Sequence, residues 1–532
     1  MNQLTSAQKN IWNLQKFYEN TTISTICGAI VYEKIISSEM LQRALNLFIQ
    51  EQESLRLQFR IVNGEPYQYV VPYEEELFPV VSFSTEQEYL EFVNMEKSRK
   101  FTLVDEKMYR FFICQFFDHT ALLLLVNHLI MDAWSVGILG SRVAELVCMY
   151  ETAGKEYEIA ISGKDEMKEN QKAYQPQICS YMEHVEREKV YKESGYYQKD
   201  QEYWRELYAV KPQIAYIKSE REANTGVNAK RFDVFMEKDF SKEILKFCRV
   251  EQITPALLFE TALCIYLGKL NLENRAVSIG MMALNRIGNK EKKMAGMFVS
   301  TIPFSVSYEE QMTVREMFDL VMKSQGGSFR HQQYPYEEIQ RYLKDRHQMS
   351  GNLYDVLFSY QNIRIESKLP FYTEWYSNGY SEVALALHVD DRDGNGMFHI
   401  TMDYQTDIFP HEEEIKLLYK RMICIMRQMM EFPEEKLERI SIIPRKEYYR
   451  LVEVFNDTHM DYNKDMCVHE LFSNQARRTP ERIALVFRQN QYTYRQIDEM
   501  SNTLAHVLCD TGLDKGSIVP VVAVRGWQVV VA

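Results

Sequence analysis

Apolar and polar residues alternate along this chain with two spacings, one typical of helices and one typical of strands. The two spacings predict helices and strands that follow one another along the chain. Residues 38–53 carry leucines at helical spacing, which predicts a helix. Residues 57–62 alternate as a half-buried strand does, Asn63-Gly64 is a two-residue turn signal, and residues 67–70 predict the returning strand. Because helix-like and strand-like segments keep succeeding one another, the chain is predicted to have an α/β (α+β) layered fold.

Two further stretches have strong patterns. Residues 121–126 are a continuous apolar run of strand length. The helical pattern that begins at Trp134 has an apolar face, formed by Leu139, Val143, Leu146, Val147 and Tyr150. In the second half, Thr254 is predicted as the N-cap of a helix reaching residue 267, with Pro255 in its first turn. Further strands are predicted at 275–281, 354–360 and 397–404.

The loop between the apolar run and the following helix carries the first candidate chemistry. It reads Asn127-His128-Leu129-Ile130-Met131-Asp132-Ala133. A histidine at the end of a buried strand sits on a rigid support, and an imidazole titrates near neutrality, at about 6.5. Asp132 lies four residues on and can fix the local backbone. Taken alone, a histidine beside an apolar run is more often a satisfied core residue than a catalytic group.

Composition narrows the classes of function. The chain has 532 residues, enough for several domains, and its 62 Lys+Arg against 75 Asp+Glu give a formal net charge of −13. An acidic chain binds phosphate backbones poorly, which argues against a nucleic-acid partner. No apolar run approaches the roughly 20 residues of a membrane span, and Met1 to Thr5 do not open a signal peptide.

Cysteine spacing and one Asp-rich turn bear on metals. The nine cysteines contain no C-x-x-C pair and are irregularly spaced, which predicts reduced thiols in a cytoplasmic protein and no zinc site. Residues 391–396 resemble the start of a calcium loop, but Met402 stands where a bidentate carboxylate is needed. We therefore predict a turn there and no metal. Residues 151–175 are predicted as a polar surface segment.

The loop around His128 resembles the HHxxxDG signature of condensation domains of non-ribosomal peptide synthetases, with Asn127 at the first His and Ala133 at the Gly. Further motifs of that family follow in its order. They are Ser6-Ala7-Gln8 with Trp12; Glu53-Ser54-Leu55-Arg56 with Phe59; Tyr197, Asp200, Tyr203 and Trp204; Gly280 to Arg286; Gly296 to Pro303; His331 to Glu337; and Phe358-Ser359-Tyr360-Gln361-Asn362. Seven ordered matches are specific together, although each is weak alone.

The tail resembles the first segment of an adenylation domain. The matching residues are His469-Glu470-Leu471-Phe472, Thr479-Pro480, Ala484-Leu485-Val486 and Tyr492 to Asp498. The sequence stops at Ala532, before that family's phosphate loop and catalytic lysine, so we expect no amino-acid activation by this piece. The predicted domains are a condensation N-lobe at 1–180, a C-lobe at 181–445, a linker at 446–466 and the truncated adenylation segment at 467–532.

The resemblance implies two chloramphenicol-acetyltransferase-like lobes that form a V with a central tunnel. Donor and acceptor carrier proteins would bring an acyl or peptidyl thioester and an aminoacyl thioester on phosphopantetheine arms, and the chain itself would bind no cofactor. His128 is the implied catalytic residue. Asp132, Arg286 and Asn127 are the implied supports of its loop, and Asp132 pairs with Arg286 in the family. The implied tunnel and floor residues are Ala133, Trp134, Ser300, Tyr360 and Gln361. Because the tunnel lies within one chain, we expect a monomer.

Several readings of this resemblance remain open. A starter-type domain, which attaches a fatty acyl group to the first amino acid, fits as well as an elongating one. A non-catalytic platform for docking carriers is the alternative from another class, but such modules usually lose the histidine that His128 retains. An epimerisation domain is disfavoured because it would follow a carrier. A cyclising variant is disfavoured because it would carry Asp at 127, and a free-standing acyltransferase is disfavoured by the adenylation tail.

Overall fold

The computed structural model describes residues 1–160, 179–218, 226–271, 275–362, 369–391, 396–462, 464–514 and 516–532. The chain divides into two compact units, Met1–Arg445 and Lys446–Ala532. In the described ranges no single helix is long and apolar enough to cross a membrane; the bent pair Lys238–Glu251 and Pro255–Leu270 meets that length and composition only when joined. All nine cysteines are free thiols.

The first lobe is built on a five-stranded sheet in the order β12-β2-β7-β6-β5. Its strand β7 (Thr120–Asn127) is buried along its whole length. Leu122, Leu124 and Val126 belong to the core that helices α2 and α4 share, whereas Leu123 and Leu125 belong to a second core beside α3. Burial on both faces explains the continuous apolar run of this strand. The other elements are β2 (Thr25–Tyr32), β5 (Val80–Ser82), β6 (Tyr109–Gln115), α1 (Ser6–Phe17), α2 (Ser38–Glu51), the short helix Glu53–Arg56, α3 (Glu86–Lys97) and α4 (Ala133–Ala160).

A small sheet adjoins it, in which β1 (Asn2–Gln3), β4 (Glu65–Val70) and β3 (Leu57–Val62) pair in the order β1-β4-β3. Asn63 and Gly64 join its hairpin with φ angles of 53° and 85°. Both angles lie in the left-handed region that a two-residue turn of this kind requires. The hairpin predicted from the sequence is therefore confirmed.

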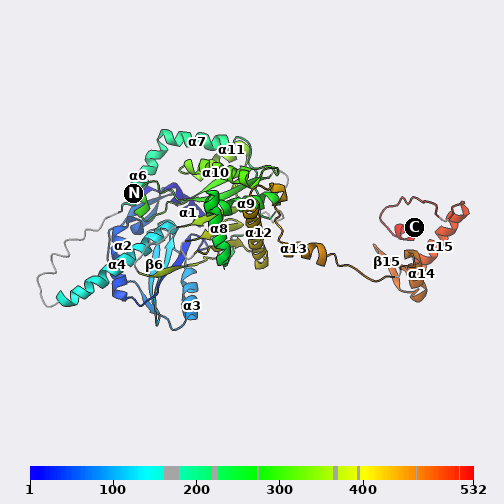
Figure 1. Cartoon of the computed structure of the whole chain (residues 1–532), viewed down its shortest axis with the longest axis horizontal. Helices are drawn as coiled ribbons and strands as arrows, with labels where there is room; N and C mark the ends of the chain where they lie inside the picture. Colours follow the sequence, from blue (N-terminus) through cyan, green and yellow to red (C-terminus); the bar gives the residue numbers. More distant parts are fainter. Residues whose placement is uncertain are drawn as a thin grey trace. The chain divides into compact units, whose positions relative to one another are not determined.

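The second lobe has a six-stranded sheet in the order β10-β9-β11-β13-β14-β8. One face packs against α8, α9, α10 and α12 in a single core, with α9 in contact with the other three helices (Figure 1). The Thr254 side chain caps α9 by accepting from the Leu257 amide, as predicted. The elements are α6 (Tyr181–Lys192), α7 (Gly195–Leu207), β8 (Ala229–Phe235), α8 (Lys238–Glu251), α9 (Pro255–Leu270), β9 (Ala276–Ala283), β10 (Ser300–Ser307), α10 (Val314–Arg330), α11 (Tyr336–His347), β11 (Val356–Gln361), β13 (Leu385–Asp390), β14 (His399–Gln405) and α12 (Glu412–Glu431).

One strand of the second half belongs to the sheet of the first lobe. Strand β12 (Phe371–Tyr376) pairs antiparallel with β2, so Phe371 lies opposite Tyr32. Directly after it, the Asn378 side chain donates to the carbonyls of Ile23 and Thr25 at 2.9 and 3.2 Å. The segment from 371 to 378 thus fastens the second half of the chain to the entrance of β2.

The second unit, Lys446–Ala532, consists of helices and a two-stranded hairpin in its described residues. The unit holds α14 (Val468–Arg478), the hairpin β15 (Ile483–Phe487) and β16 (Asn490–Thr493), α15 (Tyr494–Asp510) and α16 (Gln528–Val531). Helical segments at Arg445–Tyr449 and Arg450–Val454 occupy part of the predicted linker. Helix α4 extends past 151, where a surface segment was predicted, because polar residues such as Glu151 do not by themselves end a helix. Residues 161–178 of that segment and 392–395 of the rejected calcium loop lie outside the described residues.

Candidate active site

The loop that carries His128 is held by backbone and side-chain hydrogen bonds on both flanks. The Asn127 amide donates to the Met108 carbonyl at 2.8 Å, and the His128 amide donates to the Ser24 carbonyl at 2.8 Å. The Asn127 side chain accepts from the Leu129 amide at 3.0 Å and donates to the Ser24 hydroxyl at 3.1 Å. Asn127 is therefore placed where it braces the loop from within, as a side-chain carboxamide can both accept and donate.

His128 is half-buried and lies between the end of β7 and the start of α4. Its buried Nδ1 atom has no hydrogen-bond partner. Burial lowers the pKa of His128, while the negative charge of Asp132 and the backbone of Met131 oppose that shift. The neutral imidazole, which can accept a proton, is therefore the favoured form at neutral pH.

Asp132 and Arg286 form a buried bidentate ion pair between the two lobes. Arg286 donates to the two carboxylate oxygens at 2.6 and 3.0 Å, and each side chain is only 1% exposed. Asp132 also accepts from the Ser135 amide and hydroxyl, and from the amides of Phe298 and Val299. Burial alone would raise the pKa of Asp132, but the charge and hydrogen bonds of Arg286 and the Ser135 bonds outweigh it and lower the pKa.

The residues that follow Asp132 lead from the loop into α4. Ala133 is the first residue of α4 and is partly exposed. Trp134 is also partly exposed, and its indole N–H donates to the Lys292 carbonyl at 3.0 Å. Ser135 both donates to the Gly296 carbonyl and accepts from the Gly296 amide, each at 2.9 Å. The start of α4 is thus bonded directly to the 292–296 segment of the second lobe.

Gly296 has no room for a side chain. Its φ is +159°, and a methyl group built there would meet the Tyr181 ring at 2.3 Å and the Phe298 ring at 2.8 Å. We expect Gly296→Ala to destabilise the protein by about 1–3 kcal/mol, as overpacking does, and to shift Ser135 and Asp132. Urea unfolding of the full chain checks this, with Gly326→Ala as control, because Cβ at Gly326 meets no atom within 4 Å. Equal loss in both variants would contradict it.

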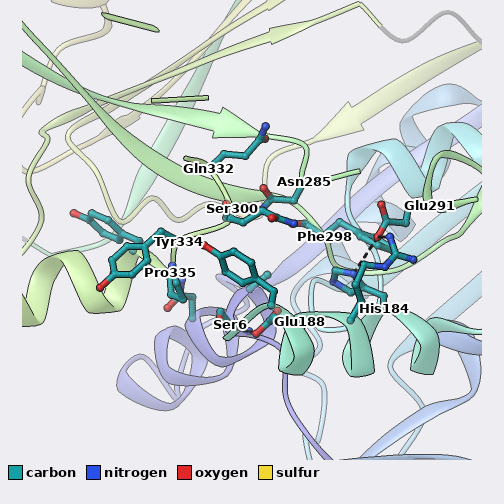
Figure 2. Close-up of a pocket in the computed structure, with 16 residues that line it drawn as sticks. Ser6, His184, Glu188, Asn285, Glu291, Phe298, Ser300, Gln332, Tyr334 and Pro335 are labelled. Atoms are coloured by element: carbon teal, nitrogen blue, oxygen red, sulfur yellow. Dashed lines mark hydrogen bonds and ion pairs between the residues drawn. The ribbon is translucent and has the colours of Figure 1, made fainter. Parts of the chain in front are cut away.

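Ser300 opens β10 and faces a pocket. The Asn285 side chain, on a residue with a left-handed φ of 50°, donates to the Ser300 hydroxyl at 2.7 Å and to the Phe298 carbonyl at 3.2 Å. Figure 2 shows Asn285 and Ser300 at the pocket beside Phe298. Ser300, which is predicted to line the tunnel, therefore lies beside a cavity.

The pocket lies between elements of both lobes (Figure 2). The first helix, α1, contributes its start, α6 contributes charged residues, and the 332–336 loop contributes tyrosines. Ser6 donates to Glu188 at 2.8 Å through its amide and its hydroxyl, while Arg187 pairs with Glu291. Burial would raise the pKa of Glu291, but the hydrogen bonds of His184 and the Gly288 amide, with the charge of Arg187, bring that pKa to about 2. The charges at this pocket are therefore mutually paired.

The two predicted floor residues of β11 point in opposite directions. The Tyr360 ring packs against the helix-covered core of the second lobe, and its hydroxyl donates to Asp391 at 2.9 Å. Successive side chains of a strand alternate between its faces, so Gln361 lies on the opposite face. Tyr360 therefore lies away from the inner face, whereas Gln361 is on the side where a tunnel floor would be. Tyr360 and Gln361 are adjacent in the motif, but they face opposite sides of the sheet because successive strand residues alternate.

Three supporting residues were not assigned roles from the sequence. Gln8 is fully buried, and its side chain donates to the Leu129 carbonyl at 3.0 Å. Gln15 accepts from the Ser24 hydroxyl, and Ser24 in turn contacts His128 and Asn127. Of these residues, only Gln8 could have been singled out from the sequence, because it belongs to the motif Ser6-Ala7-Gln8. No sequence motif includes Asn378, whose side chain donates to the carbonyls of the two residues that flank Ser24.

We expect Asn378→Ala to slow the reaction that uses His128 by about tenfold, because loss of two hydrogen bonds near 1 kcal/mol each frees the segment whose carbonyl holds His128. The global free energy of unfolding should change by less than that of Gly296→Ala. Single-turnover rates of the reaction that uses His128, beside urea unfolding, check both. A rate loss explained entirely by unfolding would contradict a positioning role.

Two other motifs meet in space. His331 Nδ1 lies 2.7 Å from an Asp200 carboxylate oxygen, and the Tyr191 hydroxyl donates to the other oxygen at 2.6 Å. Tyr203 stacks on the His331 ring with centroids 4.0 Å apart, and Trp204 donates to the His331 carbonyl at 3.1 Å. These motif residues fasten α7 to the end of α10. No group of three or more His, Cys, Asp or Glu side chains in the described ranges is arranged to hold a metal ion.

The family models match two regions of the chain. The model described as Condensation domain matches residues 1–452, and the model described as AMP-binding enzyme matches residues 472–532.

Curated relatives cover nearly all of this chain. It is 28% identical to surfactin synthase subunit 1 of Bacillus subtilis (strain 168) over 539 residues, 99% of this chain and 14% of that protein. It is 25% identical to tyrocidine synthase 2 of Brevibacillus parabrevis over 538 residues, again 99% of this chain and 14% of that protein. The chain therefore spans about a seventh of the length of these two relatives.

Solved structures show the same fold for most of the chain. The starter condensation domain of rhizomide synthetase, in complex with C8-CoA, superposes with a TM-score of 0.69 at 19% identity, covering 83% of this chain and 97% of that one. The first condensation domain of the calcium-dependent antibiotic synthetase, in complex with a substrate analogue, gives a TM-score of 0.68 at 15% identity, covering 83% and 99%. The fold class predicted from the sequence is confirmed.

Proposed function

Because the chain belongs to the condensation-domain family of non-ribosomal peptide synthetases, whose general reaction is amide-bond formation, we propose that it joins two carrier-bound substrates. The donor is an acyl or peptidyl thioester on one phosphopantetheine arm, and the acceptor is an aminoacyl thioester on another. The observation that carries the proposal is the His128 loop, which holds a half-buried imidazole with a buried Nδ1 atom and is joined to the second lobe by Asp132 and Arg286.

The reaction requires little covalent catalysis by the protein, because the acceptor attacks the donor thioester directly. The acceptor's α-amine nitrogen attacks the donor carbonyl carbon, the C–S bond breaks, and the donor's carrier leaves as a free thiol. His128 accepts the proton that the amine loses, and this proton then passes to the departing thiolate. Thioesters are already activated, so alignment of two tethered reactants supplies much of the acceleration. General-base help is typically worth about 10²–10⁴-fold.

The remaining site residues have supporting roles in this proposal. Asp132, Arg286 and Asn127 hold the loop, while Ala133, Trp134, Ser300 and Gln361 border the path of the substrates. Ala133 adds one methyl where the family has glycine, which narrows the path without closing it. The proposed domain order is N-lobe, C-lobe, linker and adenylation segment. Strand β12 belongs to the second half of the chain but pairs with β2 in the sheet of the first lobe.

Intact-protein mass spectrometry tests the proposal. The chain is mixed with a donor carrier bearing a fatty-acyl, an L-aminoacyl or a D-peptidyl thioester, and with an acceptor carrier bearing an amino acid. Transfer of the donor mass to the acceptor, dependent on the chain and lost in His128→Ala, is the expected result. Preference for fatty-acyl donors would identify a starter-type domain. Binding of carriers by a folded protein with no transfer from any donor would favour the docking platform.

A further inference from the structure

The pocket beside Ser300 has a wall whose chemistry the proposed mechanism does not use (Figure 2). The start of α1 forms one side of it, and α6, parts of the 285–300 segment and the 332–336 loop form the others. A cavity that lies between elements of two lobes is a common place for a bound ligand. The charges and hydrogen-bonding groups of its wall therefore indicate which kind of group it takes.

The ionisable side chains that line this pocket are already paired. Arg187 forms an ion pair with Glu291, and His184 Nδ1 lies 3.4 Å from the same carboxylate. Glu188 pairs with Lys192 at 2.8 Å. A charged ligand would have to break one of these pairs or lose its hydration without compensation, and both are costly. The pocket is therefore suited to an uncharged group.

The Ser300 hydroxyl is the hydrogen-bond donor at this pocket. The Asn285 side-chain nitrogen donates to Ser300 Oγ at 2.7 Å and to the Phe298 carbonyl at 3.2 Å. Because a carbonyl can only accept, the second bond fixes which end of the carboxamide faces Ser300. Among the described residues the Ser300 side chain makes no other hydrogen bond. Its own O–H is therefore available to a group in the pocket, and Asn285 orients it.

Asn10, in α1, lines the same pocket from the first lobe. In the part of the chain that the structure describes, its side chain makes no hydrogen bond, so its carboxamide oxygen is available as an acceptor. Other parts of the wall are apolar: Ala7, Phe298 and the ring of Tyr336, whose hydroxyl is occupied by the Leu353 amide at 2.9 Å. The pocket thus offers a donor, an acceptor and apolar walls.

The segment that leads to Ser300 also supports the His128 loop. The amides of Phe298 and Val299 donate to the Asp132 carboxylate at 3.2 and 3.3 Å. A group that binds at Ser300 is therefore separated from Asp132 by only one or two residues of chain. This connection relates the pocket to the substrates of the His128 loop.

We propose that this pocket is a subsite for an amide group of a substrate, whose C=O accepts from Ser300 and whose N–H donates to Asn10. Ser300 and Asn10 are its binding residues, and Asn285 is a positioning residue. This inference rests on the proposed function, since the amide belongs to a substrate of the condensation reaction. Two sources supply the same chemistry: the secondary amides of a phosphopantetheine arm, and the primary carboxamide of a substrate side chain.

Titration of the full chain with small uncharged probes, followed by ligand-observed NMR, tests the subsite without requiring turnover. N-[2-(methylthio)ethyl]acetamide stands for the arm, and butanamide stands for the side chain. Each has an ester counterpart without the N–H, 2-(methylthio)ethyl acetate and methyl butanoate. We expect one amide to bind wild type more tightly than its ester does. We expect that amide to bind Ser300→Ala and Asn10→Ala about three- to tenfold more weakly, which is the value of one neutral hydrogen bond.

Matched variants keep the result interpretable. Ser307→Ala makes the same change at an exposed position of β10 and should bind as wild type does. Asn285→Gly removes the positioning side chain at a residue whose φ of 50° glycine adopts without strain. It should reduce the preference for the amide over the ester, whereas a general loosening of the pocket would weaken both equally.

The outcomes separate the subsite from the reaction. The amide that loses affinity in the variants identifies its source. Equal binding of that amide by wild type, Ser300→Ala and Asn10→Ala would overturn the subsite, as would esters that bind as well as amides, or no binding of either amide by wild type. Loss of mass transfer between carriers with amide binding intact would instead count against the proposed function alone.

Discussion

Replacing Asp132 with alanine is expected to destabilise the Met1–Arg445 unit by about 3–5 kcal/mol, the cost of leaving a buried charge without its partner. Arg286 would stay buried with its positive charge uncompensated. The amides of Phe298 and Val299 and the Ser135 hydroxyl would lose an acceptor at the same time. Urea unfolding of the full chain, followed by tryptophan fluorescence, measures the change.

A double-mutant cycle separates the pair from its surroundings. Arg286→Ala is expected to cost a similar amount, and the Asp132→Ala/Arg286→Ala double variant less than the sum of the two, because the second substitution removes the charge that the first one stranded. The exposed pair Arg43 and Glu39 on α2 is the matched control, and its loss should cost below about 1 kcal/mol. A folded, fully active Asp132→Ala protein would contradict the structural role of this ion pair.

The pH dependence of the same pair has a definite sign. The folded-state pKa of Asp132 lies below its ordinary 3.8, since Arg286 and Ser135 outweigh burial. The stabilisation is therefore fully present above pH 3.8 and is lost as pH falls through the lower folded-state value. Unfolding midpoints of wild type and Asp132→Ala should differ by a constant amount between pH 5 and 7, and should converge only in stronger acid.

The His128 loop could be predicted from the sequence because the pattern that marks it is local. A continuous apolar run, a histidine at its end and a helical pattern after it all lie within about thirty residues, and β7 and α4 follow that pattern. The ordered motifs added Arg286, which lies 154 positions from Asp132. That pairing came from the resemblance, since no periodicity connects two residues so far apart.

Other parts of the site depend on tertiary choices that local patterns do not encode. Strand β12 reads as a member of the second half, but its hydrogen bonds go to β2. Tyr360 and Gln361 are adjacent in one motif, and only the packing of β11 decides that Tyr360 joins the helix-covered core. Asn378 gains its place from that same long-range packing. Without the sheet order, it could not be connected to His128.

His128→Ala is expected to slow amide formation by about 10²–10⁴-fold, or roughly 3–5 kcal/mol in the activation barrier, with little change in stability. The buried Nδ1 atom has no hydrogen-bond partner, and the bonds of the Asn127 side chain and the Asp132–Arg286 pair, which support the loop, do not involve the imidazole. The backbone bond from the residue 128 amide to Ser24 survives the substitution. Rapid-quench single turnovers with preloaded carriers measure the chemical step apart from carrier binding.

The pH profile and a second variant distinguish a proton acceptor from a group that only holds the amine. Burial lowers the pKa of His128 below its ordinary 6.5, so the neutral base is present throughout neutral pH and is lost only as pH falls through that lower value. Wild type should show this acid limb in addition to the one from the acceptor amine, whose ordinary pKa is about 7.7–8.0. His128→Gln retains a hydrogen-bond acceptor but takes up no proton near neutrality. A base role requires the Gln variant to stay nearly as slow as His128→Ala and to lack the lower limb, whereas recovery of the wild-type rate by Gln would assign His128 to positioning.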